Sequence, residues 1–105
     1  MEFVRVADLE AVPPGKARAF TVGRYEVALF NIDGTLYALE NACPHQGGPL
    51  ADGWIEGLTV TCPWHGWCFD VRTGSMTIGD FATIPRFEVR VEQDGVYVSL
   101  EPVPR

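Results

Sequence analysis

The sequence of 105 residues is short of histidine, cysteine and basic residues, and it has no long apolar run. It contains two histidines and three cysteines, and 8 basic side chains stand against 14 acidic ones, for a formal net charge of −6. This shortage of Lys and Arg disfavours nucleic acid as a partner, because those cations bind phosphates. No segment approaches the ~18 apolar residues of a membrane span, and the first residues carry no basic-then-apolar export signal. We therefore expect a cytoplasmic protein with no nucleic-acid or membrane partner.

The sequence also lacks the 3.6-residue apolar period of a helix over any helix-length stretch. Short apolar, β-prone runs separated by turn signals take its place, which favours an all-β fold. The length fits one domain, residues 1–105, built as a small antiparallel sandwich or barrel. Besides two hairpins, the expected strands cover residues 2–6, 16–22, 58–62 and 68–71.

Two Asp-Gly pairs predict the hairpins. Apolar runs flank Asp33-Gly34, and the same arrangement returns at Asp94-Gly95. In the second hairpin Phe87, Val89 and Val91 alternate with charged residues, the period of a half-buried strand.

The few cysteines and histidines are concentrated in one window, "CPHQGGPLADGWIEGLTVTCPWHGWCFD", residues 43–70. Cys43 and His45 form a C-x-H pair, Cys62 and His65 form a C-x-x-H pair, and 16 residues separate His45 from Cys62. Three cysteines cannot all be paired in disulfides, so a metal centre is the better interpretation. Both pairs fall in predicted loops, which neighbouring strands can bring to one centre. Nearby glycines, Gly48 among them, allow close backbone approach.

Two inorganic centres fit a set of two cysteines and two histidines. A structural zinc ion takes four such ligands, commonly grouped as cysteine pairs and histidine pairs. Here each loop mixes one cysteine with one histidine. A [2Fe–2S] cluster with one iron on two cysteines and the other on two histidines requires this mixing.

The boxes "CPHQGGPL" and "CPWHGW" resemble those of Rieske [2Fe–2S] proteins. The whole chain is similar to the Rieske ferredoxins of bacterial oxygenase systems, and also to the Rieske-type small subunit of NAD(P)H nitrite reductases. The resemblance implies thiolate ligands from Cys43 and Cys62 to one iron, and imidazole ligands from His45 and His65 to the other. It further implies a Rieske-type antiparallel β-sandwich with a small cluster-binding subdomain, about residues 42–71.

Four residues around the boxes depart from the high-potential members of this family. By resemblance, Gly48 and Trp64 occupy the positions of a disulfide that clamps the two loops in those members. Trp67 and Phe69 occupy the positions of a serine and a tyrosine whose hydroxyls lie near the cluster sulfurs. The lost hydroxyls no longer stabilise the reduced state. We therefore expect a low-potential centre, in the lower part of the Rieske span of roughly −150 to +300 mV.

The remaining residues of the window leave alternatives open. Trp64 and Trp67 either shield the centre and form a docking surface, or pack inside the subdomain. Cys68 is interpreted as a small buried hydrophobe, and Asp70 as a turn or hydrogen-bonding residue. The covering loop "SMTIGDFATIP" has only Pro85, where many family members have several prolines.

Three functions follow from these observations. The first is a soluble one-electron carrier that links a flavin-dependent reductase to a terminal oxygenase or similar enzyme, with no catalytic site of its own. The second is a small subunit of a larger reductase, nitrite reductase above all. The third is a zinc-stabilised binding module without a redox role.

Overall fold

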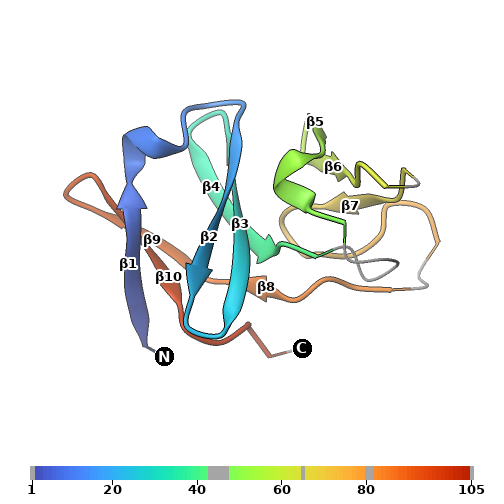
Figure 1. The fold of residues 1–105 in the computed structure, drawn as a ribbon. Coiled ribbons are helices and arrows are strands. Elements are labelled where there is room, and N and C mark those ends of the chain that lie inside the picture. Colours follow the sequence, from blue (N-terminus) through green and yellow to red (C-terminus); the bar gives the residue numbers. More distant parts are fainter. Residues whose placement is uncertain (1, 43–47, 65, 80–81, 105) are drawn as a thin grey trace.

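A computed structural model describes residues 2–42, 48–64, 66–79 and 82–104. Its strands form three sheets, in which every pair is antiparallel (Figure 1). The all-β antiparallel architecture predicted from the sequence is therefore confirmed. The first sheet has the order β1 (Phe3–Asp8), β10 (Gly95–Ser99), β9 (Val89–Glu92). The second has the order β2 (Ala17–Val22), β3 (Tyr25–Ile32), β4 (Thr35–Glu40), β8 (Arg86–Phe87). The third has the order β5 (Trp54–Glu56), β6 (Thr59–Thr61), β7 (Cys68–Asp70).

The second sheet is covered on both faces, and β3 shows why. Successive residues of a strand point to opposite faces, and here both faces meet apolar neighbours. Val27 and Leu29 pack with Val96 of the first sheet in one core. Ala28 and Phe30 pack in the other core, which includes residues of the third sheet. The unbroken apolar run "VALF" thus belongs to a strand buried on both sides.

The Asp33-Gly34 hairpin joins β3 and β4 as predicted, with φ of 53° and 94° at the two turn residues. The second hairpin forms too, but one residue earlier than expected. Gln93 and Asp94 have the positive φ values, 50° and 67°. Gly95 already belongs to β10 and pairs with Glu92. Gly95 has no positive φ and is the first residue of β10, so it belongs to the strand and not to the turn.

The run predicted as one strand over residues 87–91 is split at Glu88. The residues before it belong to β8 in the second sheet, and those after it to β9 in the first. Ser99 bonds Glu88 twice at the crossing: the Glu88 N–H donates to Oγ at 3.1 Å, and the Ser99 N–H donates to the Glu88 carbonyl at 3.0 Å. β9 is an edge strand of the first sheet, and Val91 on it is 48% exposed. Its predicted place on the buried face of the strand is therefore wrong.

Two short 3-10 helices, η1 (Leu9–Ala11) and η2 (Leu50–Asp52), complete the elements of the described residues. The first is the single helical turn allowed by the sequence before Pro13. Within the described ranges, the structure contains no helix long and apolar enough to cross a membrane.

Candidate metal centre

The third sheet lies at one end of the molecule, and the loop after β6 carries the second cysteine–histidine pair (Figure 1). Cys62 follows β6 directly. Its N–H donates to the Trp67 carbonyl at 2.7 Å and so closes the loop at the base of β7. Gly66, with φ of 73°, makes the backbone bend that this closure requires. Of the four predicted ligands, Cys62 lies in the described part of the chain and is fully buried. Cys43, His45 and His65 lie outside the described residues.

Asn41 fixes the point where the first loop leaves the second sheet. Its side chain is buried and donates to Oε1 of Glu26 on β3 at 2.9 Å. Its Oδ1 accepts the N–H of Ala51 in η2 at 2.7 Å. One amide therefore ties the scaffold to the segment that follows the first loop. The sequence analysis missed this role, for which the only signal was a polar residue between an apolar strand and the first box.

Gly48, the first described residue after that loop, lies directly against the second loop. A Cβ built on Gly48 would be 3.0 Å from Sγ of Cys62 and 3.0 Å from Cγ of Trp64. A Cβ at these distances would require Cys62 or Trp64 to shift by a few tenths of an ångström, so the glycine lets the two loops lie this close. The described residues of the two boxes, Gly48 of the first and Cys62 and Trp64 of the second, therefore lie in contact. The positions assigned to the missing disulfide, Gly48 and Trp64, face each other.

The Cys62 sulfur has the surroundings of a metal-bound thiolate. Sγ is withdrawn from solvent among the apolar side chains of the adjoining core, Val60 and Phe69 included. It accepts the N–H of Trp64 at 3.4 Å. Such an N–H donor stabilises negative charge on sulfur. A buried thiolate with a backbone donor and a glycine-lined approach fits an iron–sulfur ligand.

The two tryptophans named from the sequence behave differently. Trp67 packs against the core, which was the second alternative given for the two tryptophans. Trp64 is 47% exposed and covers Gly48. A third tryptophan, Trp54, was not singled out and is 64% exposed. Pairing of Trp54 with Thr61 across β5 and β6 places it on the outer face of the third sheet.

Cys68 pairs with Thr61 on that same outer face. Its side chain is partly exposed, and Sγ lies 3.3 Å from Oγ1 of Thr61. The interpretation of Cys68 as a buried hydrophobe is therefore wrong. The next residue, Phe69, takes the core-facing position because side chains alternate along the strand.

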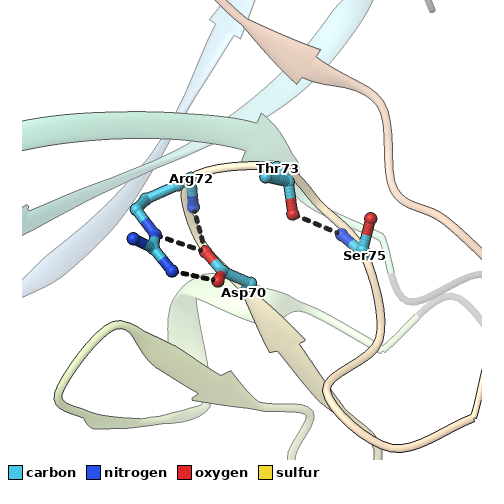
Figure 2. Close-up of polar contacts among 4 residues, drawn as sticks. All are labelled: Asp70, Arg72, Thr73 and Ser75. Carbon is cyan, nitrogen blue, oxygen red and sulfur yellow. Dashed lines mark hydrogen bonds and ion pairs between the residues drawn. The ribbon is translucent and has the colours of Figure 1, made fainter.

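Asp70 ends β7 and organises the turn that follows it (Figure 2). Oδ1 accepts the backbone N–H of Arg72 at 2.8 Å and its Nε at 3.1 Å, and Oδ2 accepts Nη2 at 2.8 Å. The side-chain hydrogen bond from Arg72 holds the pKa of Asp70 below its usual range, against the opposing effect of burial. Thr73 Oγ1 in turn accepts the N–H of Ser75 at 3.1 Å. The hydrogen-bonding role predicted for Asp70 is confirmed.

The ordered turn leads the chain back along β7. The Asp70 N–H donates to the Ser75 carbonyl at 2.8 Å, and the Thr77 N–H to the Cys68 carbonyl at 3.1 Å. The covering loop thus begins as a strand-like extension of the third sheet. Ile78, at its edge, is 83% exposed.

Gly53 is a further structural residue that sequence reasoning missed. A Cβ at this position would lie 2.1 Å from the carbonyl oxygen of Thr61, the residue before Cys62. The glycine therefore sets how closely β5 and β6 approach at the base of the second loop.

Comparison with known proteins agrees with this geometry. Residues 2–88 match the family described as Rieske [2Fe-2S] domain. The chain belongs to this family. A Rieske-type [2Fe–2S] cluster is accordingly the cofactor of the domain, and the family match decides for the cluster over a zinc ion.

Two curated relatives differ widely in the share of their own length that the match covers. One is the ferredoxin component of the naphthalene 1,2-dioxygenase/salicylate 5-hydroxylase systems of Ralstonia sp. It is 31% identical over 100 residues, which are 94% of this chain and 96% of the relative. The other is human apoptosis-inducing factor 3, 38% identical over 96 residues. That match includes 89% of this chain but spans only 15% of the human protein.

Two solved structures share the fold of this Rieske domain. One is a complex of reduced oxygenase and oxidised ferredoxin in carbazole 1,9a-dioxygenase, with a TM-score of 0.89 and 30% identity. That match covers 98% of this chain and 97% of the matched chain. The other is described as a nitrite reductase (NADPH) small subunit, with a TM-score of 0.84 and 21% identity over 94% of this chain and 99% of that one. At that identity the second likeness shows the fold alone.

Proposed function

We propose that this Rieske domain is a one-electron carrier of the ferredoxin type, an electron-transfer component without a catalytic site of its own. The observation that carries the proposal is the end-to-end match to an oxygenase-system ferredoxin component, which covers 94% of this chain and 96% of the relative.

The four ligands are proposed from the two boxes and from the described part of the site. Cys43 and Cys62 would supply thiolates to one iron, and His45 and His65 imidazoles to the other. The burial of Cys62 and the Trp64 N–H directed at its sulfur support this assignment. When bound, a cluster of this type takes up and releases one electron.

The surroundings of Cys62 support a low potential within the Rieske span. Trp67 carries no hydroxyl, and Phe69 is fully buried in the core. Neither side chain carries a hydroxyl, so the added negative charge of the reduced state receives no hydroxyl hydrogen bond from these two positions.

The proposed acceptor is a terminal oxygenase, supported by the likeness to the oxygenase–ferredoxin complex. A flavin-dependent reductase is the proposed donor. A cytoplasmic location and one domain over residues 1–105, with a cluster-binding subdomain of about residues 42–71, remain predictions. The compact third sheet, residues 54–70, supports that subdomain.

The first experiment is spectroscopy and metal analysis of the anaerobically purified protein. We expect a red-brown protein with iron and sulfide, whose reduced form gives an EPR signal of low average g. Changing Cys62 to Ala should abolish that signal, whereas Cys68→Ala should keep it. A colourless wild-type protein that contains zinc would overturn the proposal.

Co-purification separates a mobile carrier from a permanent subunit. The carrier should be isolated alone from its native host. A stable stoichiometric complex with a reductase would favour the small-subunit alternative instead.

A further inference from the structure

We propose that the indole of Trp64 is the non-covalent tie that holds the two ligand loops together and keeps water from the Cys62 sulfur. Trp64 is thus a positioning residue for electron transfer, and not a ligand. The inference rests on the proposed function, since it takes the two loops to be the ligand loops.

The contact geometry carries the proposal. Gly48 belongs to the end of the first loop, and Trp64 to the second. A Cβ at Gly48 would lie 3.0 Å from Cγ and 3.1 Å from Cδ2 of Trp64, so the five-membered ring of the indole lies against the glycine. The same Cβ would lie 3.0 Å from Sγ of Cys62. Glycine, sulfur and indole therefore form one packed contact between two loops that are distant in sequence.

The backbone and the side chain of Trp64 have separable roles. Its N–H donates to Sγ of Cys62 at 3.4 Å, and any residue except proline can provide that bond. The indole is the part of Trp64 that lies against Gly48. Although 47% of Trp64 is exposed, the buried part lies at the loop junction, where removal would open a path for water.

The chain provides a matched control. Trp54 is also an exposed tryptophan of the third-sheet region, at 64%, but it lies on the outer face of the sheet, paired with Thr61. A substitution of Trp54 changes the same surface chemistry and leaves the contact between Gly48 and Trp64 in place.

The test compares wild type, Trp64→Ala, Trp64→Phe and Trp54→Ala with cluster bound. Loss of visible absorbance under an excess of iron chelator measures how firmly the loops are held. We expect roughly tenfold faster loss for Trp64→Ala, the factor that corresponds to about 1.4 kcal/mol of lost contact. Phenylalanine should restore the rate to within about twofold of wild type, because its ring can also cover the glycine. Trp54→Ala should match wild type.

The midpoint potential gives a readout that general destabilisation would not move. Water beside Sγ of Cys62 stabilises the added negative charge of the reduced state. The potential of Trp64→Ala should therefore be higher than that of wild type, and that of Trp54→Ala unchanged.

A double-mutant cycle with Gly48→Ala tests the contact itself. The added methyl should speed cluster loss in the wild-type background, because it displaces the indole. In the Trp64→Ala background its effect should be smaller.

The outcomes are distinct. Equal release rates and potentials for Trp64→Ala and Trp54→Ala would overturn the inference while the proposed function stands. If wild type binds no cluster, the proposed function fails. The thermal midpoints of the metal-free proteins then decide the inference: a lower midpoint for Trp64→Ala than for Trp54→Ala supports the tie, and equal midpoints overturn it.

Discussion

At the scale of single residues, small polar and glycine contacts position the two loops that carry the cysteine–histidine pairs. Asn41 tethers the start of the first loop, and Gly48 allows its end to reach the second. Asp70 organises the turn that follows β7. Each of these contacts satisfies a backbone group or removes a clash, so each is expected to matter more than its small size suggests.

The pairing of Asp70 with Arg72 predicts an acid-sensitive contribution to stability. Hydrogen bonding by Arg72 lowers the folded-state pKa of Asp70. The contribution is thus complete above the unfolded-state pKa, about 3.9, and is lost as pH falls through the folded value. Since Arg72 is more than half exposed, we expect Asp70→Asn to lower the thermal midpoint at pH 7 by only about 2–4 °C.

The measurement is thermal unfolding of Asp70→Asn and wild type between pH 7 and pH 2.5. The difference in midpoint should shrink toward the acid end, because a protonated Asp resembles Asn. Glu56→Gln, at an exposed position on β5, is the control and should show no such trend. A difference that stays constant down to the lowest pH would contradict the assignment.

At the scale of elements, the close approach of β5 and β6 positions the second loop. Because a Cβ at Gly53 would lie 2.1 Å from the Thr61 carbonyl oxygen, any side chain there must move one strand. Thr61 immediately precedes Cys62, so the displacement passes directly to the proposed ligand.

We therefore expect Gly53→Ala to destabilise the fold by roughly 1–3 kcal/mol, the usual cost of overpacking. Urea unfolding measures the loss, and iron content measures the effect on the site, which should also fall. Gly57→Asn is the matched control in the β5–β6 hairpin. Its φ of 60° suits asparagine, and no atom lies within 4 Å of its Cβ position. Equal stability of the two variants would show that β5 and β6 adapt freely.

At the scale of the whole molecule, the formal net charge of −6 acts on an approaching partner at longer range than any contact does. Opposite charge on a partner accelerates encounter, and salt screens that attraction over about 10 Å at 0.1 M.

Reduction by the cognate reductase should therefore slow by about tenfold or more as ionic strength rises from 10 to 500 mM, if basic residues form its docking site. Stopped-flow absorbance measures the rate. Dithionite titrated over the same range separates this effect from changes in the cluster. A rate independent of salt would instead indicate apolar docking, with Trp54, Trp64 and Ile78 among the exposed candidates.

Local signals predicted the strands and the turn at Asp33-Gly34, because a two-residue turn and the alternating strands beside it depend on residues that are adjacent in sequence. The second turn was displaced by one residue, because Gly95 is the first residue of β10 and pairs with Asp8 of β1 and Glu92 of β9. Val91 was assigned to the wrong environment because the chain changes sheets at Glu88, where Ser99 bonds it. Cys68 was misjudged because its neighbour Phe69 takes the core-facing position.

The sequence by itself determined which residues could form the centre, since two boxes that each mix cysteine with histidine are visible in the residue identities, and its match to the Rieske family decided for the cluster over zinc. Only the tertiary structure decided how the boxes are held. The contact of Trp64 with Gly48 and the tether from Asn41 to Ala51 join separate segments of the chain. No local pattern encodes such contacts, because they exist only after three sheets have packed around two cores.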